Sequence, residues 1–295
     1  MPSSYYQQIV NRAFENAELL AVEALSGGVS ADVYRLDLVF DDQQHRSVVL
    51  REHGKSHYGH SVILEYKLLE SLSRLGIPVP KPLYWESQVQ FGDNPFILMD
   101  FISGSTSTPS TSTDLYLSKA AAMLLKIHDA PISDLPELPD RLDPLPEIFD
   151  YIPSGASWQG LTDYLDGLSD TEYQGEPKLL HGDFWPENII WNNNDIAAVL
   201  DWEDAAIGDP VSDLACSRLE IRYKFGYQGM QVFTEAYKEK IIVDPQRLAL
   251  WQIFVAAAAN HFMSDWGLSR ELEKHMRGIA IISIKEASEF LLLSE

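Results

Sequence analysis

The Ser/Thr-rich segment SGSTSTPSTSTD, residues 103–114, divides the chain into two stretches with different hydrophobic patterns. Before it, apolar and polar residues alternate in short runs separated by polar turns, which indicates strands paired in hairpins over 33–51 and 83–102. After it, apolar residues recur at helical spacing over five ranges: 115–128, 211–223, 229–240, 247–263 and 268–293. This division predicts an α+β protein with a small N-terminal antiparallel-sheet lobe at 1–102 and a larger, mostly helical C-terminal lobe at 103–295.

Three further segments have local patterns of their own. Residues 4–16 are typical of a short amphipathic helix, and leucines at helical spacing predict another helix over 64–75 that ends at Gly76. The small lobe is therefore expected to run helix, strand, strand, helix, strand, strand. The proline-rich passage 131–153 is predicted to be a long surface loop.

The charge of the chain limits its partners. Lysine and arginine total 22 against 44 aspartate and glutamate residues, so the formal net charge is -22 at pH 7. Nucleic acids and anionic membrane surfaces bind basic patches, so neither is expected as a partner. The negative field favours cations, either a divalent metal or a cationic substrate.

The same composition bears on where the protein works. Cys216 is the single cysteine, so no intrachain disulfide can form, and we expect it to fill a small apolar gap in a helix. The first residues lack the basic start and apolar run of a signal peptide. The most apolar stretch, 248–263, is interrupted by polar residues and is too short to span a bilayer. A cytoplasmic protein is therefore expected, and the oligomeric state is left open.

The segment HGDFWPENIIW, residues 181–191, contains the chemistry of interest. Asp183 and Asn188 are five residues apart, and Asp201 ends the apolar run of the next expected strand. In phosphoryl transfer, a carboxylate orients the attacking hydroxyl or accepts its proton, and an asparagine five residues later binds Mg²⁺ with a second carboxylate. The spacing predicts a phosphoryl-transfer site with Asp183 as the base and with Asn188 and Asp201 as ligands of Mg²⁺.

The upstream residues fit the same chemistry. The run Val48-Val49-Leu50-Arg51 lies on an expected strand after a glycine turn, and Glu65 lies in the next helix. With these motifs the chain resembles the aminoglycoside phosphotransferase-like family, which includes choline, homoserine and methylthioribose kinases. The resemblance covers most of the chain. It implies a bilobal, protein-kinase-like fold, ATP or GTP as the phosphate donor, and a hydroxyl group of a small molecule as the acceptor.

The resemblance also implies roles for residues around the nucleotide. Arg51 would contact the α- and β-phosphates and would be oriented by Glu65; Lys55 is the other cation near enough in sequence to do so. The loop over the phosphates would be lined by three residues: Gly27, Gly28 and Ser30. The hinge beside the adenine, where main-chain groups read the base, would be marked by three more: Asp100, Phe101 and Ile102.

Several other polar and aromatic residues have a structural interpretation. His181 is expected to support the backbone of its loop, and His128 to be buried or to cap its helix. For Asp209 and Asp213, a carboxylate that binds loop N–H groups is favoured over a metal ligand. The position of Trp251, Trp266, His261 and Asp265 allows them to line an acceptor pocket, but aromatic residues at helical spacing are more often core. Three acidic residues remain undecided between binding a cationic acceptor and lying in solvent: Glu187, Glu203 and Asp204.

Three functional hypotheses follow from these residues. The first is a small-molecule kinase whose acceptor is cationic, such as an aminoglycoside-like compound, an amino alcohol or a sugar. The second is a kinase-fold protein that binds nucleotide with weak or no activity, for which Arg51 and the incomplete glycine motif are the only support. The third, a protein kinase, is disfavoured because the A-P-E signature and a recognisable activation segment are absent from the sequence.

Overall fold

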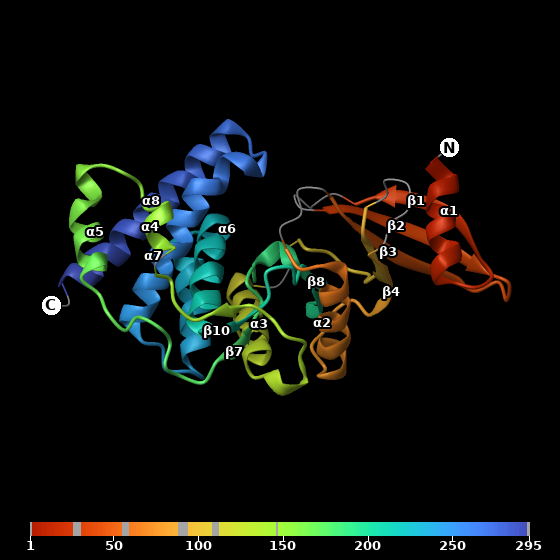
Figure 1. The fold of residues 1–295 in the computed structure, drawn as a ribbon, viewed down its shortest axis with the longest axis horizontal. Helices are drawn as coiled ribbons and strands as arrows, with labels where there is room; N and C mark the ends of the chain where they lie inside the picture. The colour runs from red at the N-terminus through yellow and green to blue at the C-terminus, as the bar shows by residue number, and fades with distance from the viewer. Residues whose placement is uncertain are drawn as a thin grey trace.

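The computed structural model describes residues 2–25, 31–54, 59–87, 94–107, 112–145 and 147–293. Figure 1 shows a sheet-containing part at the N-terminal end and a helical part at the C-terminal end. The N-terminal part contains these elements: α1 (Pro2–Ala13), β1 (Ala17–Ala24), β2 (Ala31–Phe40), β3 (His45–His53), α2 (Val62–Arg74), β4 (Pro82–Glu86) and β5 (Phe96–Asp100). The predicted α+β class, with an antiparallel sheet and a helical part, is confirmed.

The five strands form one antiparallel sheet in the order β1-β2-β3-β5-β4. Its apolar residues alternate between the two faces. Leu36 and Leu50 are fully buried in a cluster with Ile9 and Val10, through which α1 covers one face (Figure 1). Burial of each such side chain contributes about 1.5–3 kcal/mol. The opposite face leaves alternate residues of β3 and β5 turned toward α2 and a cleft described below.

Helix α2 follows the sheet and places Glu65 beneath it. Ser61 caps the helix, since its side chain accepts a hydrogen bond from Leu64 N at 3.3 Å. The helix ends at Arg74 with Leu75 as its C-cap, and Gly76 adopts a left-handed conformation with φ of 75°, as its predicted capping role requires. Glu65 lies in the first turn on the buried face with Leu68, Leu69 and Leu72. The leucine pattern therefore turns the carboxylate inward.

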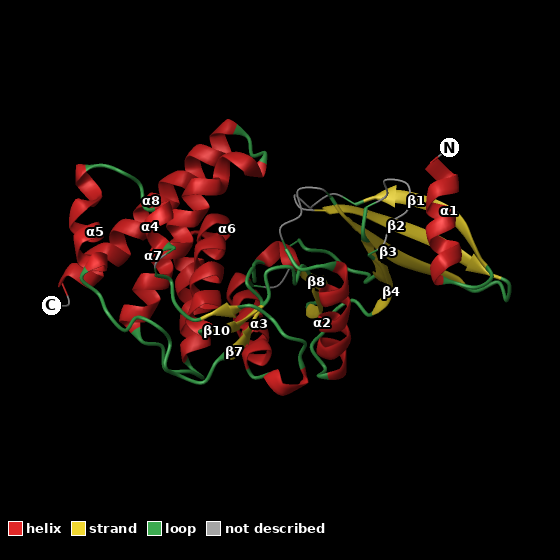
Figure 2. Ribbon diagram, in the orientation of Figure 1, coloured by secondary structure: helices red, strands yellow, loops and turns green. Residues whose placement is uncertain are grey.

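The C-terminal part is mainly helical (Figure 2). Its helices are α3 (Thr113–His128), η1 (Ile132–Asp134), α4 (Ile148–Tyr151), η2 (Ala156–Trp158), α5 (Gln159–Asp166), η3 (Pro186–Asn188), α6 (Pro210–Lys238), α7 (Pro245–Phe262), η4 (Met263–Trp266) and α8 (Arg270–Leu293). Its short strands are β6 (Asp140–Arg141), β7 (Lys178–Leu180), β8 (Ile189–Asn192), β9 (Asp195–Val199) and β10 (Ala206–Gly208). The sheet β6-β10-β7 and the hairpin β8-β9 flank the 181–188 segment.

One core cluster continues from the N-terminal part into the C-terminal part. It contains Leu72 of α2, Leu124 of α3 and Phe233 of α6, together with Trp202 from the segment between β9 and β10. Helix α6 runs through this core and changes direction at Gly226, whose φ of 70° and ψ of -173° are not helical. The break falls between the two helices expected at 211–223 and 229–240.

Three expectations about secondary structure were wrong. Strand β1 was not predicted, because most of its side chains are exposed and it lacks the alternating pattern of a half-buried strand. The 131–153 passage is not a plain surface loop: β6 pairs with β10 in parallel, and Ile148 of α4 is fully buried. Helix α5 was also not expected. The proline-rich composition of 131–153 concealed β6 and α4, which have only two and four residues. Helix α5 lies after that passage and has eight residues.

Among the helices in the described part of the chain, none is both long and apolar enough to cross a bilayer.

Candidate active site

A cleft of about 290 Å³ lies between the sheet and the C-terminal part. Its walls come from β2, β3, α2, the segment after β5, and the two segments that carry the polar motifs. Seven of the candidate nucleotide- and metal-binding residues line it: Arg51, Glu65, Asp100, Phe101, Ile102, Asn188 and Asp201. Glu187, which the sequence left undecided, lines it as well. Asp183 is hydrogen-bonded to one of them and lies beside this cleft. Gly27, Gly28, Ser30 and Lys55 lie outside the described residues, although Leu25 and Ala31 on either side of the glycines line the cleft.

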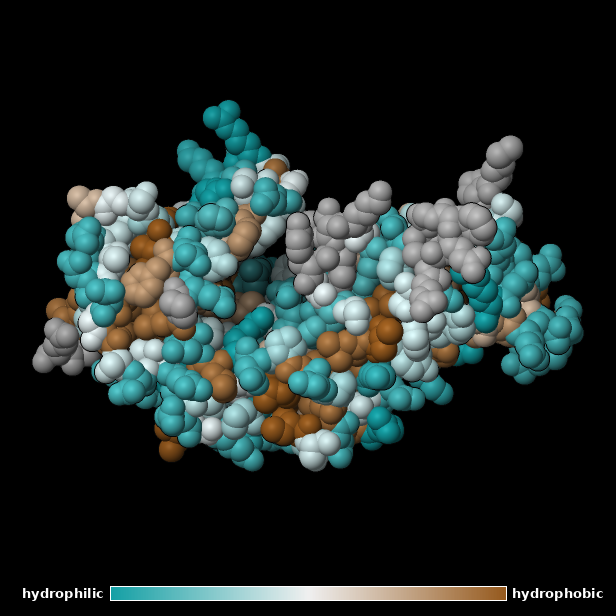
Figure 3. All heavy atoms as spheres, in the orientation of Figure 1, coloured by the Kyte–Doolittle hydropathy of each residue, from teal (hydrophilic) through white to brown (hydrophobic). Residues whose placement is uncertain are grey.

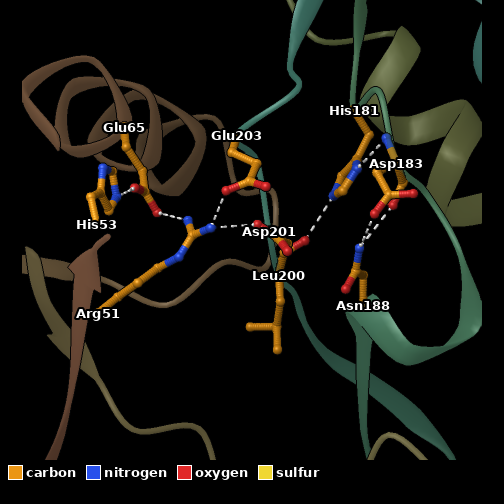
Figure 4. Close-up of polar contacts among 9 residues, drawn as sticks. All are labelled: Arg51, His53, Glu65, His181, Asp183, Asn188, Leu200, Asp201 and Glu203. Atoms are coloured by element: carbon orange, nitrogen blue, oxygen red, sulfur yellow. Dashed lines mark hydrogen bonds and ion pairs between the residues drawn. The ribbon is translucent and has the colours of Figure 1, made fainter. Parts of the chain in front are cut away.

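Arg51 is the central cation of the cleft (Figure 4). Its Nη1 donates to Glu65 Oε1 at 2.7 Å, and its Nη2 donates to Asp201 Oδ1 at 2.9 Å and also to Glu203. Strand β3 delivers the arginine, and α2 delivers Glu65 from the other side. Arg51 is 7% exposed and Glu65 is 2% exposed, so the pair is almost fully desolvated.

The ionisation of this pair follows from its partners. Burial by itself would raise the pKa of Glu65, but Arg51 and His53 outweigh it and lower that pKa to about 2. His53 Nε2 lies 2.8 Å from Glu65 Oε2. Burial opposes the charge of Arg51 as well, yet its three carboxylate partners raise the pKa of the guanidinium. Both groups are therefore charged, and the carboxylate holds the guanidinium toward the cleft.

Asp183 and Asn188 form a second polar pair across the 3₁₀ turn of η3. Asn188 Nδ2 donates to Asp183 Oδ2 at 3.0 Å and to Asp183 O at 2.9 Å, as Figure 4 shows. Burial raises the pKa of Asp183 to about 7, and the charges of Asp201 and Asp204 add to the effect. The hydrogen bond from Asn188 opposes this shift only in part. The side chain is thus a carboxylate that titrates near neutral pH.

Asp201 follows β9 with a positive φ of 60°, which turns its side chain into the cleft. Burial raises its pKa to about 6; Arg51 opposes the rise, whereas Glu203, Glu65 and Asp204 reinforce it. The region therefore carries more carboxylates than cations, and a divalent cation would relieve their repulsion.

The residues present fit Mg²⁺. Asp201 and Asn188 offer carboxylate and amide oxygens, which are the ligands of a hard cation. In the described ranges no three His, Cys, Asp or Glu side chains converge as a ready metal cluster. Mg²⁺ is commonly held by one or two protein carboxylates together with water and substrate phosphates, so a sparse protein ligand set is adequate.

Asp213 of α6 holds the backbone in front of Asp183. Its two carboxylate oxygens accept from His181 N at 2.7 Å and from Gly182 N at 2.8 Å. His128 Nε2 lies 3.2 Å from the same carboxylate, and Tyr237 Oη lies 2.8 Å from His128 Nδ1. The loop-binding role expected for Asp213 and the burial expected for His128 are both observed.

His181 and Asp209 also have the structural roles expected from the sequence. His181 is fully buried, its Nε2 lies 2.9 Å from Leu200 O, and burial lowers its pKa to about 4, so the ring is neutral. Asp209 caps α6 by accepting from Val211 N at 3.0 Å, and it also accepts from Trp251 Nε1 at 2.6 Å and from Arg247. Trp251 is a core residue, as expected.

Replacement of Asp213 by asparagine should lower the free energy of unfolding by about 2–4 kcal/mol, because a buried charged acceptor of two backbone N–H groups is lost. Urea denaturation would measure the loss. Asp166→Asn, at the exposed end of α5, is the matched control and should change stability by less than about 0.5 kcal/mol. Equal effects of the two substitutions would contradict the anchoring role of Asp213.

Two features of the cleft were not identified from sequence. The sequence did not decide whether Glu203 binds a ligand or lies in solvent; in the structure its carboxylate accepts a hydrogen bond from Arg51. The two residues are 152 positions apart, so no local pattern could have joined them. Trp185 and Thr106 also line the cleft. Trp185 belongs to the motif segment and could have been suspected from that position.

The side chain of Asp100 has a partner away from the cleft. Its Oδ1 accepts from Arg46 Nη2 at 2.6 Å, while its backbone N donates to Lys81 O. The guanidinium of Arg35 lies 4.7 Å from the ring centre of Phe101. The side chains of Asp100 and Phe101 therefore each have a partner, and residues 100–102 line the cleft.

A second cavity, of about 770 Å³, adjoins the backbone of Gly182 on the side of α7. Its apolar wall includes Trp251 and Phe254. Its acidic lining residues are Asp140, Asp143, Glu147, Glu203 and Asp204, and the basic residues among the lining are Arg141 and His60. The cavity is thus predominantly acidic and touches the residue that precedes Asp183.

Comparison with known proteins begins with a family model for the phosphotransferase enzyme family (APH), which matches residues 21–251. Acyl-CoA dehydrogenase family member 11 of Homo sapiens is 28% identical over 181 residues, which are 53% of this chain and 22% of that protein. Acyl-CoA dehydrogenase family member 10 of Mus musculus is 26% identical over 183 residues, 54% of this chain and 17% of that protein. The chain thus spans about a fifth of the length of these curated relatives.

Solved structures with the same fold include the aminoglycoside phosphotransferase APH(4)-Ia, with a TM-score of 0.66 at 14% identity over 97% of this chain and 99% of that one. A macrolide 2'-phosphotransferase type I aligns with a TM-score of 0.63 at 17% identity over 94% and 95%. A ternary complex of an APH(4)-Ia thermostable mutant with AMP-PNP and hygromycin B has a TM-score of 0.64 at 16% identity over 94% and 97%. These similarities confirm the predicted kinase-like fold.

Proposed function

Because the chain belongs to the phosphotransferase enzyme family, we propose that it transfers the γ-phosphate of ATP or GTP to a hydroxyl group of a small molecule. One observation carries this proposal: Arg51 of β3, Glu65 of α2 and Asp201 after β9 meet at one cleft, and the Asp183–Asn188 pair borders it. A buried cation, a carboxylate near neutral pKa and oxygen ligands for a metal are the parts that phosphoryl transfer needs.

Asp183 is proposed to orient the acceptor hydroxyl and to take its proton. Its pKa of about 7, raised mainly by burial, is matched to work near neutral pH. The hydrogen bond from Asn188 fixes the carboxylate in one orientation, so that little reorganisation is needed when the acceptor arrives.

The nucleotide is proposed to lie in the 290 Å³ cleft. Arg51, pre-oriented by Glu65, would contact the α- and β-phosphates, and the main chain of Asp100, Phe101 and Ile102 would border the base. Gly27, Gly28 and Ser30 remain the proposed phosphate loop on sequence grounds. Asn188 and Asp201 would hold Mg²⁺, which when bound would neutralise charge on the phosphates.

The acceptor is proposed to occupy the second cavity, since that cavity is lined by Gly182, the residue before Asp183. Its acidic lining and the net charge of -22 support a cationic acceptor, such as an amino sugar or an amino alcohol. Acceptors of this kind include the aminoglycoside-like compounds considered from the sequence.

Consumption of ATP with Mg²⁺ against a panel of hydroxyl compounds tests the proposal. The panel contains aminoglycosides, macrolides, choline, homoserine, methylthioribose and fructosamines. We expect ADP formation with at least one class and its loss when EDTA removes Mg²⁺. Binding of Mg²⁺·ATP without turnover on any acceptor would instead favour a nucleotide-binding protein of the same fold.

A further inference from the structure

Glu203 lies in the segment between β9 and β10 and is associated with both cavities. Its carboxylate accepts a hydrogen bond from Arg51, which lines the cleft of about 290 Å³. The same residue lines the second cavity, of about 770 Å³. The proposed cation for the nucleotide phosphates is therefore paired with a side chain that belongs to the other cavity.

Among the described residues, three carboxylates converge on the guanidinium of Arg51 (Figure 4). Glu65 accepts from Nη1, whereas Asp201 and Glu203 both accept from Nη2. Asp201 is the proposed ligand of a metal that the phosphates share, so the phosphates are expected at Nη2. An Nη group carries two N–H donors, and each donor of Nη2 already has a carboxylate to bind. A phosphate that binds Nη2 must therefore replace one of these carboxylates.

The backbone around Glu203 is held in place by two neighbours. Glu203 O accepts from His60 N at 3.2 Å, and His60 Nε2 lies 2.9 Å from Ala205 O. A Cβ atom added at Gly182 would lie 2.1 Å from Asp204 O, so the same segment also packs closely against the backbone that precedes Asp183. An exchange of partners at Arg51 would therefore move the side chain of Glu203 and leave its backbone where it is.

The side chain of Glu203, unlike its backbone, has room to move. It is 16% exposed and lines the second cavity, and Figure 3 shows the surface hollowed between the helical part and the middle of the molecule. Asp201 has a different task in the proposed site, because it would remain beside the phosphates as a metal ligand. Glu203 is therefore the carboxylate that can leave Nη2 when a phosphate arrives.

We propose that the phosphates of a nucleotide displace Glu203 from Arg51, so that Glu203 lowers the affinity of the cleft for a nucleotide that brings no metal ion. The inference rests on the nucleotide site of the proposed function. A phosphate that replaces a carboxylate on the guanidinium exchanges one charge-assisted hydrogen bond for another and gains little from the contact. The displaced carboxylate also leaves its negative charge near the phosphates, which disfavours a nucleotide whose charge is not neutralised.

The test compares adenosine with ADP in the presence of EDTA, because the two ligands share base and ribose and only ADP brings phosphates to Arg51. Calorimetric titration of the full chain measures each affinity. In Glu203→Gln we expect ADP to bind about tenfold more tightly than in the wild-type chain, because the neutral amide competes weakly for Nη2. Adenosine should bind equally well to both chains, which also shows that the cleft of the variant is folded.

A matched control separates competition at Arg51 from the loss of one negative charge. Glu286 of α8 is also paired with an arginine, through hydrogen bonds of 2.6 and 3.0 Å from Arg222, and it lines neither of the two cavities. Glu286→Gln makes the same change in net charge and should leave the affinity for ADP at the wild-type value. Glu203→Asp keeps the charge on a shorter side chain and should strengthen ADP binding less than Glu203→Gln does.

Two results would overturn the inference: ADP affinity in Glu203→Gln that is no higher than in the wild-type chain, or an equal gain for adenosine and ADP. An equal gain would mean that the substitution reshapes the cleft and does not remove a competitor for Arg51. Failure of the wild-type chain to bind either ligand, with or without Mg²⁺, would reject the nucleotide site itself and the inference with it. Binding of ADP that does not depend on Glu203 would reject the inference and leave the proposed function standing.

Discussion

Asp183→Asn is expected to reduce the rate of phosphoryl transfer about 10³-fold, within the range of about 10²–10⁴ that a positioned general base contributes. Asparagine has nearly the same shape, so the nucleotide cleft is retained and Mg²⁺·ATP affinity should change less than about threefold. The rate is measured as ADP formation with the acceptor identified by the panel, and affinity by titration with AMP-PNP. Turnover at the wild-type rate would show that another group takes the proton.

The same substitution should stabilise the metal-free fold at neutral and higher pH. The pKa of Asp183 is raised from 3.8 to about 7, so the folded state binds the proton more tightly than the unfolded state does. The resulting destabilisation grows as pH rises from about 4 to about 7 and is constant above that. Asp183→Asn removes it, and the melting temperature should rise by a few degrees at pH 8 and by less at pH 5.

Thermal melts in EDTA at the two pH values measure this difference. Asp166→Asn, the exposed control on α5, should shift the melting temperature by less than about 1 °C at either pH. A gain in Asp183→Asn of the same size at pH 5 and pH 8 would mean that the carboxylate of Asp183 is not strained by its neighbours. A gain in melting temperature at pH 8 together with a loss of phosphoryl transfer would show that Asp183 lowers the stability of the fold while it contributes to the proposed reaction.

Local patterns were sufficient for the parts of the site that lie close together in the chain. Asp183 and Asn188 are joined by one 3₁₀ turn, and Asp201 ends the hairpin that follows, so sequence spacing alone brings them near one another. Arg51 and Glu65 are separated by one strand end and one helix start. Periodicity placed the arginine on a strand and the carboxylate in the next helix, and the resemblance to the phosphotransferase family implied that the two side chains pair.

The parts that could not be predicted depend on how distant elements pack. Glu203 reaches Arg51 only because the segment after β9 crosses the cleft, and no periodicity encodes that crossing. Asp213 and Ser217 lie within a predicted helix, but their hydrogen bonds to the backbone of 181–184 depend on how that helix packs against the segment. Strand β1 was missed for a related reason: as an exposed edge strand it carries little of the burial that creates a pattern.

Arg51→Met should abolish nucleotide binding and lower the free energy of unfolding by about 3–5 kcal/mol at pH 7, because it leaves Glu65 charged and buried. In the wild-type chain the pKa of Glu65 is lowered to about 2, so its ion pair contributes stability above about pH 4.5 and loses it as pH falls through 2. Without Arg51, burial dominates and Glu65 takes up a proton more readily. The loss caused by Arg51→Met should therefore be smaller at pH 5 than at pH 8 in urea denaturation.

A second substitution separates the two tasks assigned to Arg51. Glu65→Gln in the Arg51→Met background removes the uncompensated charge and keeps a group that can hydrogen-bond His53, so more than half of the lost stability should return. Nucleotide binding should not return, because no cation faces the phosphates. If stability stayed low in the double variant, Arg51 would be needed for packing rather than as the counter-ion of Glu65. If AMP-PNP affinity recovered with stability, the phosphates would have another partner, and Lys55 would be the first residue to replace.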